Sequence, residues 1–377
     1  MNDTRLGSSS MKAFALVLAS IGTVFACSTE ESPSTFEPPA DAGDMADARS
    51  VDQDATTPNF EPDAGDDGGE WFTTDCLPTT MCKAGVSLDA FSALNGVTVT
   101  ETDVWAVGSL GLIVHHDGAA WSTEKLASPD TMMQIIQRPD GGLWAIGGPL
   151  YNGPNADDAG ASGFARVRMP VVGLITALWA KDSKTAWAAG DRIYKIEVAD
   201  DGSALASPYY FSGDTNGLRA IHGTPDGVLW AVGRIGSAHR IWTPDVANPQ
   251  SDMLNTQTYA TLNAVWPIAS NDVWAVGDQG TIRHYTGQGR VWDIVESPVT
   301  TSLRAIWAGS ANDVWAVGDG GVVVHYDGTN WRRIAVSGLG TQRPDLRAIW
   351  GSSSGRVFAV GANVILGLGT SVAGGAK

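Results

Sequence analysis

One short stretch occurs almost unchanged in two places: NDVWAVGDQG at 271–280 and NDVWAVGDGG at 312–321. A five-residue core of this stretch, with an aromatic residue second and a glycine last, occurs seven times. The copies are VWAVG at 104–108, LWAIG at 143–147, AWAAG at 186–190, LWAVG at 229–233, VWAVG at 273–277, VWAVG at 314–318 and VFAVG at 357–361. Their spacing of 39 to 44 residues is typical of a repeat in which each copy belongs to one small β-sheet.

Each copy lies within a larger unit. A weaker motif precedes it, as in LRAIW at 303–307. A run ending in Asp-Gly follows, as in GVVVHYDG at 321–328, and then a strand that begins with an aromatic residue, as in NWRRIAV at 330–336. Asp-Gly is a hairpin signal, so each unit predicts four short strands. Both faces of the VWAVG strand are apolar, which requires cover on two sides.

Sheets that stack face to face around an axis provide such cover. With 45 Gly, 15 Trp and only 17% charged residues, the composition also favours short strands and tight turns over helices. We therefore predict an all-β chain with a single seven-bladed β-propeller of four-stranded blades over residues 71–370, followed by a flexible tail at 371–377. A β-solenoid or two β-sandwiches would explain a repeat of this length less well.

The last unit ends early, because NVILGLG at 363–369 is followed by no strand that begins with an aromatic residue. The segment EWFTT at 70–74 precedes the first unit and belongs to none. We expect it to pair as the outer strand of the seventh blade and so to close the ring. The alternative is that residues 70–90 form an irregular cap.

The N-terminus resembles an export signal. Lys12 precedes a 14-residue apolar run at 13–26, which is too short for a membrane-spanning helix and ends at Cys27. The tetrapeptide VFAC is similar to the lipobox of bacterial lipoproteins, which implies a lipid on Cys27 that holds the protein at a membrane surface. An ordinary signal peptide cut near Ala26 is the alternative, and translation starts at either Met1 or Met11.

Most of the net charge of −17 lies in one segment. Residues 28–70 contain 13 acidic residues and one Arg, a net charge of −12, together with many Pro, Ser and Ala. This composition predicts a disordered acidic linker, since DAGDD within it lacks the ligand spacing of a calcium loop. Residues 71–377 are only mildly acidic and carry no basic footprint, which argues against nucleic-acid binding.

Cys76 and Cys82 are the other two cysteines, and in an exported chain they lie in an oxidising compartment. They are close enough in sequence to form a disulfide that braces the ring closure, and no His or further Cys lies nearby to make a metal site. Two free thiols are the alternative.

The stretch SLRAIWAGSANDVWAVGDGGVVVHYDGTNW at 302–331 resembles the Trp-rich β-propeller lipoproteins of myxobacteria. It is also similar to tectonin repeats and, distantly, to the Asp-box repeats of sialidase-like propellers. The resemblance covers about residues 71–370 and implies the fold more than a function. HYDGTNW keeps Asp327, Gly328 and Trp331 of an Asp box but lacks its leading Ser or Thr.

No constellation in the sequence predicts catalysis. His115, His284 and His325 take the same third-strand position in different units, where packed histidines are the expected reading. Asp103, Asp272 and Asp313 each begin a second strand, where a capping role is expected. We found no nucleophile elbow, P-loop, dinucleotide fingerprint or zinc spacing. The sequence therefore predicts no catalytic residue, no metal and no cofactor, and it leans against an enzyme.

The candidate binding site lies on the inner strands, which line the channel of a propeller. One position is polar in every unit, and three of its arginines suit a carboxylate or phosphate. The residues are Ser92, Gln134, Thr176, Arg219, Asn263, Arg304 and Arg347. Further along the same strands a largely aromatic ring is suited to stacking on sugars, and it comprises Asn95, Gln137, Trp179, His222, Trp266, Trp307 and Trp350. Solvation of the channel and packing between blades are the alternatives.

These features predict a monomeric, lipid-anchored module of the bacterial outer membrane or cell surface that binds an envelope glycan or protein without catalysis. The alternatives are a degenerate Asp-box glycoside hydrolase and an envelope assembly scaffold. The sequence leaves open the ligand and the membrane leaflet.

Overall fold

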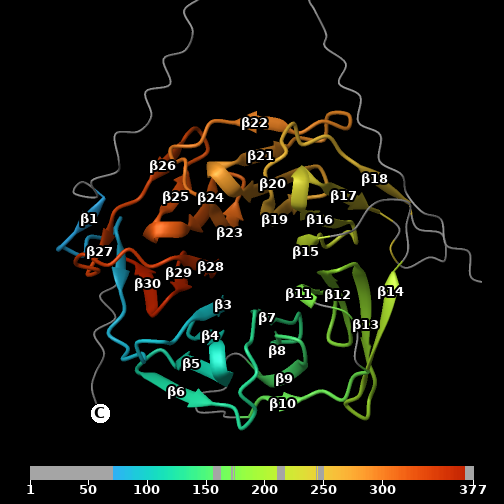
Figure 1. Ribbon diagram of the computed structural model, residues 1–377, viewed down its shortest axis with the longest axis horizontal. Coiled ribbons are helices and arrows are strands. Elements are labelled where there is room, and N and C mark those ends of the chain that lie inside the picture. Colours follow the sequence, from blue (N-terminus) through green and yellow to red (C-terminus); the bar gives the residue numbers. More distant parts are fainter. Residues whose placement is uncertain are drawn as a thin grey trace, which may run out of the picture. The chain divides into compact units, whose positions relative to one another are not determined.

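The computed structural model describes residues 71–155, 163–170, 173, 175–209, 217–242, 244 and 250–369. The predicted signal peptide, the lipidation site Cys27, the acidic linker and the tail at 371–377 lie outside these residues. Within the described part the chain forms a β-propeller in which sheets surround a central axis (Figure 1). No described helix is long and apolar enough to cross a membrane.

Six sheets are four-stranded antiparallel meanders, which we number as blades 1 to 6 from the N-terminal side. Blade 1 consists of β3 (Leu94–Val99), β4 (Val104–Gly108), β5 (Leu112–His116) and β6 (Trp121–Lys125). Blade 2 consists of β7 (Gln134–Gln137), β8 (Gly142–Ile146), β9 (Leu150–Asn155) and β10 (Ala165–Arg166). Blade 3 consists of β11 (Ile175–Ala180), β12 (Thr185–Gly190), β13 (Ile193–Val198) and β14 (Ala204–Tyr209).

Blades 4 to 6 repeat this pattern with different strand lengths. Blade 4 consists of β15 (Leu218–Gly223), β16 (Leu229–Gly233), β17 (Ala238–Ile241) and β18 (Ser251–Met253). Blade 5 consists of β19 (Leu262–Ala269), β20 (Asp272–Gly277), β21 (Ile282–Tyr285) and β22 (Asp293–Val295). Blade 6 consists of β23 (Leu303–Ser310), β24 (Asp313–Gly318), β25 (Val323–Tyr326) and β26 (Trp331–Arg333).

The remaining sheet, the closing sheet, has six strands and joins both ends of the described chain. Its order is β28 (Leu346–Gly351), β29 (Val357–Gly361), β30 (Val364–Leu368), β2 (Met81–Lys83), β27 (Val336–Ser337) and β1 (Phe72–Thr73). The prediction of seven four-stranded blades is therefore wrong in this sector, because only six sheets have four strands. The two strands beyond the fourth position are β27, from the connection between β26 and β28, and β1, from the segment before the repeat.

An N-terminal strand does complete the closing sheet, but it is not the expected one. Met81 pairs with Leu368, so β2 takes the fourth position. The predicted strand at 70–74 is represented by β1, which lies at the outer edge and runs parallel to β27. The fourth strand position of the closing sheet is buried, and an apolar side chain suits it. Met81 of β2 is fully buried there, whereas Phe72 of β1 is only half-buried.

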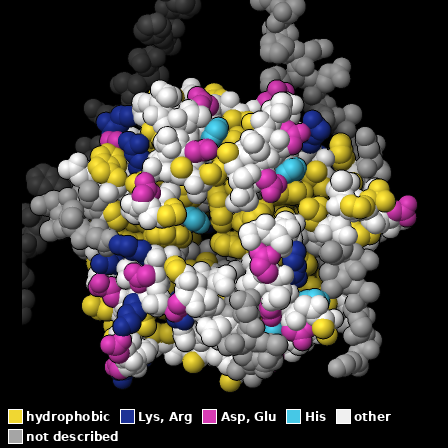
Figure 2. All heavy atoms as spheres, turned by 180° about the vertical axis from the view of Figure 1, so that it is seen from behind, with side chains coloured by type: hydrophobic (Ala, Val, Ile, Leu, Met, Phe, Trp, Pro, Cys, Tyr) yellow, Lys and Arg dark blue, Asp and Glu magenta, His cyan; other side chains and the backbone are white. Residues whose placement is uncertain are grey.

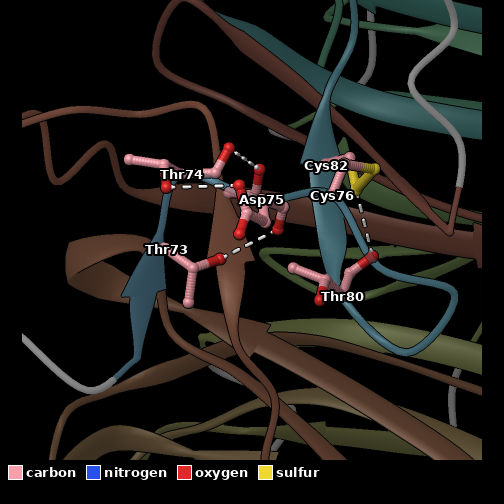
Figure 3. The surroundings of a disulfide bond; sticks show 7 residues. Thr73, Thr74, Asp75, Cys76, Thr80 and Cys82 are labelled. Atoms are coloured by element: carbon pink, nitrogen blue, oxygen red, sulfur yellow. Dashed lines mark hydrogen bonds between the residues drawn. A yellow bond between two sulfur atoms is a disulfide. The ribbon is translucent and has the colours of Figure 1, made fainter.

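Cys76 and Cys82 form a disulfide that joins the loop after β1 to β2 (Figure 3). In the same loop the Thr73 hydroxyl donates to the carbonyl of Asp75 over 3.1 Å. The disulfide therefore ties the segment that leads into the ring to the strand that closes it.

The inner strands contact one another around the whole ring, including β28 with β3 across the closure. Buried apolar side chains form a separate cluster at each junction between neighbouring sheets. The motif aromatics lie in these clusters and are at most 5% exposed: Trp105, Trp144, Trp187, Trp230, Trp274, Trp315 and Phe358. The prediction that they fill the space between sheets is confirmed.

The motif glycine is required by close approach rather than by an unusual backbone angle. Gly318 is extended, with φ −160°, but a Cβ built on it would lie 2.0 Å from the carbonyl oxygen of Ser302 at the start of the inner strand. Gly108 and Gly361 meet an inner-strand carbonyl at the same distance. The turn that follows is a 3-10 turn with two residues of positive φ, as in η4 (Asp319–Gly321), where Gly320 has φ 65° and Gly321 has φ 75°.

Candidate functional site: the channel and its two levels

The polar ring lies on a β-bulge at the start of the inner strands. The pairing of β23 with β24 skips one residue between Leu303 and Ala305, and Arg304 is the extra residue. The same shift occurs in blades 1, 3, 4 and 5 and in the closing sheet. A bulge leaves its residue unpaired and redirects its side chain, which here places the polar side chains at one end of the channel.

The structure changes two members of the predicted ring. In blade 1 the bulged residue is Asn95, not Ser92, since the register shift lies between Leu94 and Gly96. In blade 2 Met133 takes the equivalent place, one residue before Gln134, which still lines the channel. Thr176, Arg219, Asn263, Arg304 and Arg347 lie where they were expected, and all five line one cavity of about 190 Å³.

The three arginines of this ring have different surroundings. Arg304 binds Asp319 through two hydrogen bonds of 2.8 and 2.6 Å, which raises the pKa of its guanidinium, and it also reaches Asp278 at 3.4 Å. Arg347 donates to the neutral side-chain oxygen of Asn95 over 2.8 Å. Arg219 is exposed and makes no hydrogen bond or ion pair with the described residues.

The asparagines of the ring link neighbouring sheets. Asn95 donates to the carbonyl of Met132 in the next blade, and Asn263 donates to the carbonyl of Leu303, each over 2.9 Å. Asn263 also donates to Asp278 over 2.9 Å. Part of the ring is therefore structural, as the alternative reading of these residues expected.

About three residues further along the inner strands lies the aromatic level. Trp179, His222, Trp266, Trp307 and Trp350 each lie opposite a motif aromatic in the strand pairing. In blades 1 and 2 that position belongs to Thr98 and Ile136. Assigning Asn95 and Gln137 to this ring was therefore wrong, because the inner-strand segments of blades 1 and 2 had been aligned out of register with the others.

Two of these indoles pack against glycines of the next sheet. A Cβ on Gly223 would lie 2.5 Å from the Trp179 ring, and one on Gly351 would lie 2.5 Å from Trp307. Trp307 is only 5% exposed, so its main contact is packing between sheets.

The other aromatic side chains form a chain of ring contacts across the channel. Trp266 lies edge-on to Trp350 with centroids 5.1 Å apart, and His222 lies 4.5 Å from Trp266. The Nδ1 atom of His222 lies 2.9 Å from the carbonyl oxygen of Gly223 and donates to it, which leaves Nε2 as an acceptor. Burial lowers the pKa of this imidazole to about 4, so it is neutral at pH 7.

A cavity of about 500 Å³ opens at the aromatic level. Its walls are mostly apolar, with a few amides and one arginine at the edge. The residues that line it include Gln134, Gln137, Arg138, Trp179, His222, Trp266 and Trp350. Figure 2 shows one face of the molecule, on which hydrophobic side chains gather around a central hollow while charged side chains lie mostly further out. This size and lining are typical of small-molecule and short-segment binding sites.

The histidines and aspartates singled out in the sequence form pairs within blades 1, 5 and 6. The Nε2 atoms of His115, His284 and His325 each lie 2.7 Å from the carboxylate of an aspartate that begins the second strand. The aspartates are Asp103, Asp272 and Asp313, in that order. The capping interpretation missed these pairs.

Each pair is completed by the motif Trp. The imidazole stacks on the indole with centroids 3.6, 3.8 and 4.1 Å apart in blades 1, 5 and 6. In blade 6 the Trp315 Nε1 also donates to Asp313 over 2.7 Å, and the hydrogen bond from His325 lowers the pKa of that carboxyl. A signal was present in the sequence, since each Asp precedes its His by 12 residues. The triads lie within separate blades and support packing.

Other blades present a different side chain to the motif Trp. Arg240 lies opposite Trp230 in blade 4, and Lys195 lies opposite Trp187 in blade 3. The guanidinium of Arg240 also binds Asp252 at 3.0 Å. Over the described ranges, no group of three or more His, Cys, Asp or Glu side chains is placed to hold a metal ion.

No family model matches this chain, and no curated protein matches it. Solved structures do match. Streptogramin B lyase has a TM-score of 0.60 and 18% identity over 75% of this chain and 94% of its own. YCF48 bound to D1 peptide has a TM-score of 0.58 and 16% identity, with 76% and 96% covered.

The extracellular domain assigned to a hybrid two component system of B. thetaiotaomicron has a TM-score of 0.60 and 13% identity over 77% of this chain. This chain spans only 40% of that structure. Identities this low establish a shared fold alone, so the chain is similar to known β-propellers without a family being assigned.

Proposed function

We propose that this protein is a non-catalytic recognition module of the cell envelope, which binds a glycan or a segment of a protein at the aromatic level of its channel. One observation carries the proposal. The cavity of about 500 Å³ presents the side chains of Trp179, Trp266 and Trp350 together with the amide of Gln137. Apolar walls with a few convergent polar groups are what bind and orient a small ligand.

A glycan suits this lining because the C–H face of a sugar ring packs on an indole while its hydroxyls reach polar neighbours. Gln137, Arg138 and the Nε2 atom of His222 supply donors and an acceptor at the cavity. Burial keeps the imidazole of His222 neutral at pH 7, so it adds no charge to the cavity.

A protein segment is the second occupant, supported by the structure of YCF48 bound to D1 peptide, which shows that one propeller of this shape holds a peptide. The likeness at 16% identity concerns the fold, so the peptide is offered only as a class of ligand. It enters the experiment as a separate arm.

The absence of paired acids supports binding over hydrolysis. Glycoside hydrolysis commonly requires two carboxyl groups on either side of the scissile bond. No Asp or Glu belongs to the described residues that line the aromatic cavity. Asp327 of the Asp-box-like turn accepts backbone N–H groups of Thr329 and Asn330 instead, which is a turn role.

Export and lipid anchoring at Cys27 are part of the proposal. They are supported by the apolar run at 13–26, the VFAC tetrapeptide and the Cys76–Cys82 disulfide, since disulfides persist in oxidising compartments. Residues 28–70 would then space the propeller from the membrane. The test is detergent phase partitioning of the protein produced in a bacterial host. Cys27→Ser is expected to move the protein from the detergent phase to the aqueous phase, and an unchanged partition would contradict the lipid anchor.

The binding proposal is tested by isothermal titration of the chain from residue 28 against a panel of neutral and acidic oligosaccharides and a set of envelope peptides. Trp350→Ala and Trp179→Ala should each weaken binding at least about ten-fold. The matched control is Tyr259→Ala, which removes an aromatic side chain that is 89% exposed and outside the cavity. Thermal unfolding of each variant verifies that it folds.

The outcomes separate the alternatives. Release of new reducing ends during incubation with a glycan would favour the hydrolase. Failure of the whole panel, or equal losses in Tyr259→Ala and Trp350→Ala, would remove the aromatic cavity as the recognition site and leave the scaffold alternative.

A further inference from the structure

In each sheet, one residue at the polar level of the channel directly follows the motif glycine, at the start of the turn after the second strand. We call this the rim position, and it lies next to the bulged residue of the inner strand. Blade 6 has Asp319 there, in contact with Arg304 of the bulge, and blade 5 has Asp278 there, in contact with Asn263. The two positions thus bring their side chains within hydrogen-bonding distance of each other.

Blade 4 has arginine at both positions. Arg219 is the bulged residue between Leu218 and Ala220, and Arg234 follows the motif glycine in η2 (Arg234–Gly236). The alkyl stem of Arg234 packs over Gly217, since a Cβ there would lie 2.4 Å from its Cδ. Blade 4 therefore places two positive charges where blade 6 has an ion pair.

Within the described part of the chain, neither Arg219 nor Arg234 forms an ion pair with a carboxylate. Nearby acids are already engaged. Asp278 and Asp319 bind Arg304, Asp345 accepts the N–H of Gly320, and Asp191 accepts the hydroxyl of Tyr194. Blades 5 and 6 bring these two positions into contact, and two like charges at neighbouring positions repel each other unless an anion lies between them.

A third arginine lies at the same level. Arg347 lines the cavity of about 190 Å³ together with Arg219, and its hydrogen-bond partner is the neutral Asn95. The closing sheet has Ala362 at the rim position, so Arg347 lacks the carboxylate that Arg304 has. A space of this size is large enough for one small oxyanion group.

We propose that Arg219, Arg234 and Arg347 form a binding site for a single oxyanion group, a carboxylate or a phosphate, at the polar level of the channel. Planar guanidinium groups bind both anions through paired hydrogen bonds. Arg304 is not part of the site, because Asp319 already occupies its donors. The site lies about 10 Å along the inner strands from the aromatic level, and it does not depend on the function proposed for that level.

The test is isothermal titration of the chain from residue 28 with inorganic phosphate and, separately, with acetate, in low-salt buffer without other oxyanions. Binding at one site is expected for at least one probe, and the tighter probe identifies the anion. Arg219→Gln and Arg347→Gln should each weaken it about ten-fold. Arg219→Lys should retain part of the affinity, which a folding defect would not allow.

Two further variants distinguish a specific anion site from nonspecific electrostatic attraction. Asp319→Asn releases Arg304 and should tighten binding. Arg332→Gln is the matched control, because it removes an exposed arginine on β26 that pairs with Asp327 outside the channel. The proposal is overturned if neither probe binds in the millimolar range, or if Arg332→Gln weakens binding as much as Arg219→Gln.

Discussion

Blades 4 and 6 share one backbone and differ in the polar side chains placed on it. Both have a four-stranded meander, a bulge at the same place and a buried motif Trp. Blade 6 satisfies its polar groups internally, with Arg304 on Asp319 and His325 on Asp313. Blade 4 has arginine at both positions that form the ion pair in blade 6, namely Arg219 and Arg234, and it has His222 where blade 6 has Trp307.

The comparison shows which positions the fold requires. The Trp and the glycine of the motif are needed in both blades, because one fills the space between sheets and the other allows a close backbone approach. The bulged residue and the rim residue are not needed for packing, so they differ between blades. The site that we infer lies where blade 4 departs from the pattern of blade 6.

The largest effect is expected where the two blades agree. Trp230→Ala in blade 4 and Trp315→Ala in blade 6 each remove a buried indole and leave a cavity, at a cost of about 3–5 kcal/mol in the free energy of unfolding. Chemical denaturation measures both. A loss below about 1 kcal/mol in either blade would contradict the stacking model, and Tyr259→Ala is the exposed aromatic control.

The next effect depends on His222, which only blade 4 has. Its pKa is lowered by burial to about 4 from the usual 6.5, so the unfolded chain takes up the proton first as the pH falls. Stability should therefore decrease between pH 6.5 and pH 4 by at most about 3 kcal/mol, and be unaffected by this group above pH 6.5. His222→Phe should remove that part of the pH dependence; the same slope in the variant would assign it to another group.

A smaller effect is expected in blade 6. Asp313→Asn weakens the hydrogen bonds from His325 and Trp315 and should cost about 1–2 kcal/mol at pH 7. The pKa of Asp313 is lowered below its usual 3.8 chiefly by His325, so its contribution is present above pH 3.8 and is lost as the pH falls further. Unfolding curves at pH 7 and pH 3 check this, with the difference between wild type and variant shrinking at pH 3.

Arg240→Gln is the counterpart in blade 4. Arg240 takes the place of the histidine beside Trp230, and a guanidinium stays charged at every pH at which the protein is folded. Any loss of stability that the substitution causes should therefore be the same at pH 8 and pH 6, as measured by chemical denaturation. A loss confined to one pH would show that the two blades do not use these positions as described.

The smallest effect on stability is expected from a substitution that gives blade 4 the polar pair of blade 6. Arg234→Asp gives blade 4 the arginine–aspartate pair of blade 6 and should stabilise the fold by at most about 1 kcal/mol, because the pair is exposed. The same variant should abolish anion binding, since the introduced carboxylate would then occupy the donors of Arg219. Unchanged anion affinity in this variant would show that Arg219 and Arg234 do not act together.

Much of the candidate site could be predicted from the sequence, and the errors have two causes. Arg219, Asn263, Arg304 and Arg347 were assigned correctly because their units match the motif LRAIW closely. Ser92 and Gln134 were given the wrong register because their segments, FSALN at 91–95 and MQIIQ at 133–137, match this motif poorly. A shift of one to three residues moves a different side chain into the channel. The His–Asp pairs were missed because the two residues lie on different strands.

The sequence by itself determined the repeat, and through it the sheets and the burial of the motif aromatics. A strand that is apolar on both faces has no stable arrangement except between two neighbours. The tertiary structure decided how the ring closes, where the bulges fall and which charges meet. These depend on pairing between segments far apart in the chain, such as Met81 with Leu368, and local periodicity carries no information about such partners.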